Sequence, residues 1–137
     1  MPVNLPTVEQ ARTDLVGIRR GQGLARPTVV LDLSPQFRGH LLADKPRHGD
    51  TANQITALLA ALRKAIESLN PEDRAALEAD FNLAAEHSAP TLTERRQSLA
   101  DARHVSFRTI TRTADKALDI LALALVTTQQ QDSLPTD

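Results

Sequence analysis

Side chains that can cap a helix stand directly ahead of several apolar runs in this chain, and this arrangement constrains the fold more than any other feature. A Ser, Thr or Asn in that position accepts hydrogen bonds from the free N–H groups of the first helical turn. Three of these residues are followed three positions later by Gln or Glu, the pattern of a capping box: Thr7 with Gln10, Thr51 with Gln54, and Thr91 with Glu94. The sequence therefore predicts an all-α protein.

About six helices can be placed from these caps and from apolar residues that recur every three or four positions. The expected helices run from Thr7 to about Arg20, from Ser34 to a stop before Pro46, from Thr51 to Leu69, from Asn70 to Ala84, from Thr91 to a turn before Ser106, and from Ser106 to Val126. The last helix is expected to be long. The stretch 28–33, TVVLDL, is rich in β-branched residues, and its state stays open between an extended segment, a short helix and a strand that pairs across a dimer.

At 137 residues the chain is long enough to bury a core without crosslinks. We expect an N-terminal helical segment at 1–50, a helical domain at 51–127 whose residues 91–127 form a hairpin, and a disordered polar tail at 128–137. No leader peptide and no apolar run of membrane-spanning length is apparent, so a soluble protein with no membrane partner is expected. The absence of Cys suits a cytoplasmic location.

Residue types that usually carry catalysis, metals or cofactors form no recognisable set. The four His residues are scattered and there is no Cys, so no metal site is expected. The only Gly cluster, at 21–23, is not followed by the residues of a phosphate-binding loop, so no cofactor is expected. Because no acid–base pair or activated nucleophile is apparent, we expect a protein that is not an enzyme.

Residues 91–126 have the pattern of two helices joined by a short turn. The small Ala100 is expected where the helices cross, and Val105 is expected to fill the turn. Ser106 is expected to cap the second helix, which Ile110 anchors from beneath. Each of these residues therefore has a steric role in the predicted hairpin.

This hairpin resembles the helix-turn-helix of bacterial regulators and the promoter-reading, region-4-like domain of sigma factors. The matching residues are Leu99, Ala100, Val105, Ser106, Thr109, Ile110 and Arg112. The opening of the preceding helix adds Leu69, Pro71 and Arg74, and the later part of the last helix adds Ala117, Leu118 and Leu121. Two positions depart from the family pattern, because Arg103 stands where an apolar residue is usual and His104 where Gly usually makes the turn. His104 is expected in the left-handed conformation, which His tolerates better than most non-Gly residues.

The resemblance implies a sequence-specific duplex DNA-binding protein, a transcriptional regulator whose last helix enters the major groove. Eight residues are predicted to contact or position the DNA: Arg95, Arg96, Arg103, Ser106, Phe107, Arg108, Thr111 and Arg112. The two Arg residues of the last helix are expected on guanine edges, Phe107 on a thymine methyl group, and Thr111 on a base edge or a phosphate. The three earlier Arg residues are expected on phosphates. Residues 91–113 hold these five Arg against two acidic residues, a local charge of +3.

The segment 120–126, ILALALV, is apolar on all sides of its helix, so we expect it to be buried all round. Either the N-terminal helices surround it or a second subunit covers it, and a homodimer would also place two recognition helices on the DNA. The alternative function is a non-enzymatic adaptor that binds a protein partner through this helix and a degenerate helix-turn-helix. The net charge of −1 favours that alternative.

Overall fold

The computed structural model describes residues 6–42 and 51–132, the last five as backbone only, and the secondary structure in these ranges is helical, without strands. Six α-helices and three 3-10 helices occur in these ranges: α1 Val8–Ile18, η1 Gly23–Ala25, η2 Pro27–Asp32, α2 Pro35–Leu41, α3 Thr51–Glu67, α4 Pro71–Asp80, η3 Ala85–His87, α5 Leu92–Arg103 and α6 Phe107–Asp132. The prediction of a small all-α protein with about six helices is confirmed.

Most helices begin at the residues predicted to cap them. The hydroxyl of Thr7 accepts a hydrogen bond from the N–H of Gln10 at 3.0 Å, and the side-chain oxygen of Asn70 accepts one from Asp73 at 2.9 Å. Thr51 differs, because it is already the first residue of α3 and so does not occupy the predicted cap position. Local hydrogen bonding therefore determines where most of these helices start.

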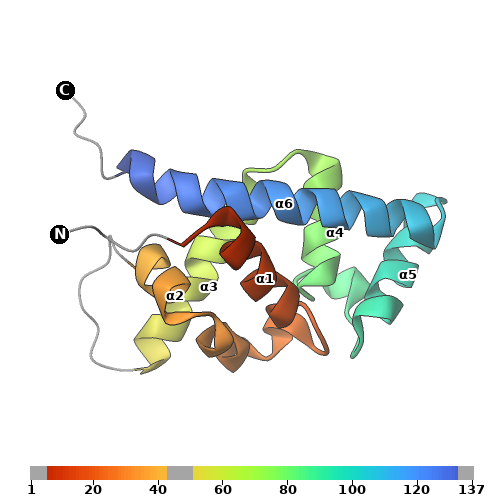
Figure 1. The fold of residues 1–137 in the computed structure, drawn as a ribbon. Coiled ribbons are helices and arrows are strands. Elements are labelled where there is room, and N and C mark those ends of the chain that lie inside the picture. Colours follow the sequence, from red (N-terminus) through yellow and green to blue (C-terminus); the bar gives the residue numbers. More distant parts are fainter. Residues whose placement is uncertain (1–5, 43–50, 133–137) are drawn as a thin grey trace.

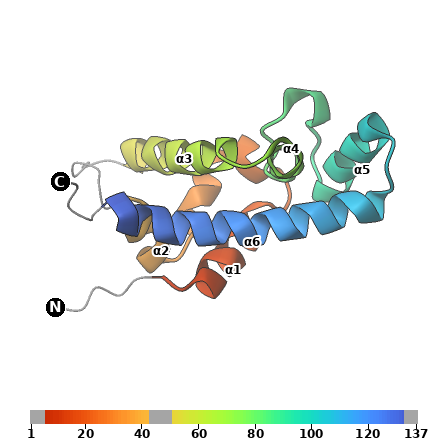
Figure 2. The ribbon, with the colours of Figure 1, turned by 90° about the horizontal axis from the view of Figure 1, so that it is seen from above.

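The long helix α6 runs the length of the molecule and the other helices pack around it (Figure 1). In the view from above, α1 lies on one side of α6, whereas α3 and α4 lie on the other (Figure 2). The largest buried cluster draws on all of these helices: Ala11, Leu15, Ile18, Leu24, Val30, Leu33, Phe37, Leu41, Leu58, Leu62, Ile66, Leu77, Phe81, Ala117, Leu118, Leu121, Ala122, Leu125 and Val126. The N-terminal segment thus shares one core with α3 and α6.

Two stretches that the sequence did not assign to a helix are helical in the structure. Residues 28–33 belong largely to the 3-10 helix η2, which begins at Pro27 and buries Val30 completely. The predicted tail is wrong over 128–132, since α6 continues to Asp132; Gln is a good helix former and no Gly or Pro interrupts the run. Residues 133–137 lie outside the described part.

The apolar segment of α6 is not buried all round by the described residues. Of the two predicted alternatives, complete enclosure by the N-terminal helices is therefore wrong, and cover by a second subunit stays a prediction. The inward residues Leu121 and Ala122 of this segment are fully buried, but Ile120 keeps 37% and Leu123 51% of its surface exposed. The reason is geometric: neighbouring helices cover α6 on its sides and beneath, and the remaining face of the helix has no neighbour among the described residues (Figure 2).

Candidate nucleic-acid interface at the helical hairpin

The turn between α5 and α6 has the backbone geometry that the sequence predicts. His104 ends α5 in the left-handed conformation, with φ 57° and ψ 41°. The N–H of Val105 then donates to the carbonyl of Ala100 at 3.1 Å, which closes the end of the helix. Ser106 caps α6, because its hydroxyl accepts the N–H of Thr109 at 3.1 Å. The side-chain oxygen of Ser106 is therefore engaged as the N-cap of α6.

A second, smaller core fixes the angle between the two helices of the hairpin. It consists mainly of small residues from α4, α5 and α6: Ala76, Ala79, Leu99, Ala100, Ile110 and Ala114. Ala100 is fully buried and Ile110 is 6% exposed, as their predicted roles require. Small side chains let the helix backbones approach closely, so α4 completes a three-helix unit with the hairpin.

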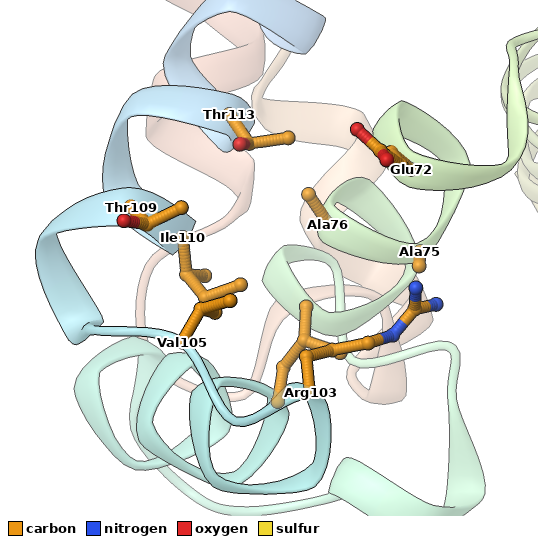
Figure 3. Close-up of a pocket in the computed structure, with 9 residues that line it drawn as sticks. Glu72, Ala75, Ala76, Arg103, Val105, Thr109, Ile110 and Thr113 are labelled. Carbon is orange, nitrogen blue, oxygen red and sulfur yellow. The ribbon is translucent and has the colours of Figure 1, made fainter.

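Val105 does not fill the turn, and this prediction is wrong. It remains 41% exposed and lines a groove of about 300 Å³ between α4 and the hairpin. Figure 3 shows Glu72 and Ala75 on the α4 side of this groove, with Thr109 and Thr113 on the α6 side. The short side chains of Ala75 and Ala76 on α4 do not fill this space, and the side chain of Arg103 extends from the end of α5 toward Ala75 (Figure 3).

Arg95 is the clearest departure from the predicted interface. Its side chain is fully buried and donates all five N–H groups to main-chain carbonyl oxygens. These oxygens belong to Ala79 at 2.9 Å, Gly21 at 2.6 Å, Ala89 at 2.8 Å, Arg19 at 2.9 Å and Asp80 at 3.0 Å. Burial lowers the pKa of Arg95, and the charge of Asp80 opposes this effect. No donor is left for a phosphate, so the predicted DNA contact of Arg95 is wrong.

Arg96 is also held in the interior, by a carboxylate that is itself fully buried. Its Nε and a terminal nitrogen bind the two oxygens of Asp80 at 2.9 and 2.8 Å. Arg19 at the end of α1 reaches the same carboxylate at 3.4 Å and also contacts Asp115 on α6 at 3.4 Å. Burial opposes the charge of Arg96, but the hydrogen bonds and charge of Asp80 outweigh it and raise the pKa. The predicted phosphate contact of Arg96 is therefore wrong as well.

A signal for this burial is present in the sequence. Leu99 and Ala100 form the inner face of α5, and Arg95 and Arg96 lie one helical turn earlier on the same face. The net charge of residues 91–113 does not show which face of α5 is buried. The helical period does show it, but it does not reveal which acceptors a buried Arg would bind.

The remaining predicted cations are free. Arg103, Arg108 and Arg112 are exposed, and none forms a side-chain hydrogen bond or ion pair with another described residue. Lys116, one turn further along α6, is exposed and equally free. We call Arg108, Arg112 and Lys116 the α6 stripe. The start of α6 thus presents positive charge at one end of the molecule (Figure 1).

Phe107 and Thr111 are partly buried, so they are less accessible to DNA than the three free Arg residues. The hydroxyl oxygen of Thr111 is shielded from solvent and has no hydrogen-bond partner among the described residues. Asp115 follows on the same helix, and its ion pairs with Arg19 and Arg96 connect α6 to the buried arginine network. Of the eight predicted contacts, the three free Arg residues are therefore the best placed to meet a ligand.

Comparisons with known proteins add no family: no family model, no curated protein and no solved structure matches the chain. Within residues 6–42 and 51–132, no group of three or more His, Asp or Glu side chains is placed to hold a metal ion. Among the helices of the same ranges, none combines the length and apolar character needed to cross a bilayer.

Proposed function

We propose that this protein binds duplex DNA and reads its sequence with the start of α6, as a transcriptional regulator of the helix-turn-helix class. One observation carries the proposal. Arg108 and Arg112 lie one turn apart on the exposed start of a capped helix, and neither is neutralised by an acidic side chain of the described chain. Unpaired guanidinium groups on such a helix are suited to an anionic partner with a groove about as wide as a helix.

The spacing of the two Arg residues suits base recognition. Four residues of α-helix advance by about 6 Å, so side chains at i and i+4 reach different base pairs of one groove. Each guanidinium can bind the O6 and N7 atoms of a guanine with two hydrogen bonds, and each such pair contributes about 1–3 kcal/mol of discrimination. Arg103 and Lys116 flank the pair and are assigned to phosphates, while Phe107 offers its exposed edge to a thymine methyl group.

The experiment is selection of bound duplexes from a random pool at two salt concentrations, followed by sequencing. The unaltered protein should enrich one motif, and retention should weaken as the salt concentration rises. Arg108→Ala combined with Arg112→Ala should lower affinity for that motif at least tenfold, since two base contacts of about 1–3 kcal/mol each are lost. Arg63→Ala combined with Lys64→Ala removes the same charge from exposed positions of α3 and serves as the control.

Circular dichroism and gel filtration establish whether each variant keeps the fold and the oligomeric state of the unaltered protein. Failure of the unaltered protein to retain any duplex at low salt would refute the proposal. Equal losses for the α6 and α3 variants would show that net charge alone, rather than the α6 stripe, controls binding.

A non-enzymatic adaptor is the second candidate, and one observation favours it. Ile120 and Leu123 expose large apolar surfaces on α6, next to residues that are fully buried. A protein partner or a second copy of the chain would remove these surfaces from water. If the chain binds no duplex, Leu123→Lys should abolish binding of a partner captured by the unaltered protein while leaving its helix content unchanged.

A further inference from the structure

We propose that the groove between α4 and the hairpin binds a small zwitterion with an apolar body, of the class of free α-amino acids with apolar side chains. Such a site is independent of the proposed function. The groove has a volume of about 300 Å³, which lies at the small end of the range of about 300–1,000 Å³ typical of small-molecule sites. A ligand of the size of one amino acid therefore suits it better than a nucleotide or a larger cofactor.

Two opposite charges belong to the lining of this groove. Glu72 lies in the first turn of α4, and Arg103 is the last residue of α5. The side chain of Arg103 points toward Ala75, which is one helical turn from Glu72 on the same side of the groove (Figure 3). Both charged side chains are exposed, and neither forms a hydrogen bond or ion pair with another described residue. The groove thus offers an unpaired cation and an unpaired anion to one ligand.

The rest of the lining is apolar except for two Thr residues of α6. Its apolar members are Ala75, Ala76, Leu99, Val105 and Ile110. Leu99 and Ile110 are almost completely buried, whereas Val105 keeps 41% of its surface exposed. A ligand with a hydrophobic side chain removes part of the Val105 surface from water, which favours binding. The groove therefore favours an apolar ligand body over a polar one.

The two charges disfavour ligands that carry only one charge. An anion is attracted by Arg103 but repelled by Glu72, and a cation experiences the reverse. A zwitterion satisfies both, because its carboxylate can accept two parallel hydrogen bonds from the guanidinium while its ammonium group donates to Glu72. Since Glu72 and Arg103 do not pair directly, a ligand that bridges them meets both charges. An α-amino acid carries the two groups on one carbon and leaves its side chain free for the apolar lining.

The residues that would contact the ligand's side chain also hold the hairpin together. Ala76, Leu99 and Ile110 belong to the smaller core between α4, α5 and α6. A bound ligand therefore joins these three helices at one more point and raises the melting temperature of the protein. Arg103 is assigned to a phosphate under the proposed function, and one guanidinium cannot fully serve both partners. Ligand binding is accordingly measured without DNA.

The test is isothermal titration calorimetry of the full chain with L-leucine and L-phenylalanine, each of which should bind with a Kd below about 1 mM. Three compounds each lack one part of leucine: 4-methylpentanoate has no ammonium group, 3-methylbutylamine has no carboxylate, and glycine has no apolar side chain. Each of them should bind about tenfold more weakly than L-leucine or worse, because one charge-assisted hydrogen-bonding group or the apolar contact is lost.

Two variants assign the charges. Arg103→Gln and Glu72→Gln should each lower the affinity for L-leucine by about tenfold. Glu72→Gln should also bring 4-methylpentanoate and L-leucine to similar affinities, because the partner of the ammonium group and the repulsion of the carboxylate disappear together. A merely structural effect does not change this preference. Arg108→Gln on α6 and Glu9→Gln on α1 remove the same charges from exposed positions outside the groove lining, so they should leave the affinity unchanged.

Ala75→Leu places a larger side chain in the groove and keeps both charges. Ala75 is half-buried, so the fold should persist, as far-UV circular dichroism checks, while binding of L-leucine should be lost. Absence of binding for both amino acids at about 10 mM would overturn the inference, and so would equal affinities of the unaltered protein for L-leucine and 4-methylpentanoate. If neither amino acid binds and Ala75→Leu abolishes self-association in gel filtration, the groove accommodates a second copy of the chain and the inference is likewise overturned. None of these outcomes bears on the duplex selection that tests the proposed function.

Discussion

Replacement of Arg95 by Met should destabilise the protein by several kcal/mol, although the change removes a charged side chain in favour of an apolar one of similar length. The hydrogen bonds to the carbonyls of Ala79 and Asp80 are buried, and those to Arg19, Gly21 and Ala89 are partly buried. A buried carbonyl left without a partner costs about 1–3 kcal/mol. The Asp80 oxygen loses its partner and accounts for roughly 1–3 kcal/mol, whereas the Ala79 oxygen keeps the N–H of Asn82 at 3.1 Å. Water can satisfy the other three oxygens at smaller cost.

Together with the lost bonds to the partly buried oxygens, we expect a loss of about 3 kcal/mol from the free energy of unfolding, a substantial part of the roughly 5–15 kcal/mol that a domain of this kind possesses. Arg95→Lys is the informative companion, because it keeps the charge but offers three donors from one point instead of five in a planar fork. It should lose about half as much. If Arg95 were a surface residue that contacts phosphate, the Lys variant would be as stable as the original protein.

The assay is equilibrium unfolding in urea followed by far-UV circular dichroism, with Arg112→Met as the matched control. Arg112 is exposed and unpaired, so its replacement should change stability by no more than about 0.5 kcal/mol. A loss of stability below about 1 kcal/mol for Arg95→Met, indistinguishable from the Arg112 control, would refute the assigned role of Arg95. That role is to join the segment after α1, at Arg19 and Gly21, to α4 and α5.

Two further stability predictions follow from the backbone. Gly23→Ala should destabilise the protein by about 2 kcal/mol or more, because the added Cβ would lie 2.8 Å from the carbonyl oxygen of Phe81. Gly21→Ala has a similar φ of 55° but open space around it, so it should cost only about 1 kcal/mol. Equal urea midpoints for the two variants would contradict this prediction. His104→Gly should stabilise the protein by up to about 1 kcal/mol, since His104 holds φ 57°, and a lower melting temperature would show that the side chain compensates for its backbone conformation.

The sequence predicts correctly the features that depend on interactions between residues close together in the chain. The cap at Ser106 and the left-handed turn at His104 depend on atoms within a few positions, so the order of residues is sufficient to place them. The inner face of α5 at Leu99 and Ala100 follows from the helical period in the same way. These local rules yield the six helices and the hairpin.

Tertiary structure determines which of the arginine residues are buried and which are exposed. The five acceptors of Arg95 come from segments up to 76 positions away in the chain, and only the packing of α1, α4 and α5 brings these carbonyls to one point. A count of charged residues in the sequence therefore treats Arg95 and Arg108 as equivalent, although Arg95 is completely buried and Arg108 is exposed. The chain by itself determines which side chains carry charge and where helices begin. Only the fold determines which of those charges remain free to bind a partner, because a guanidinium is neutralised or satisfied by whatever groups the packing places beside it.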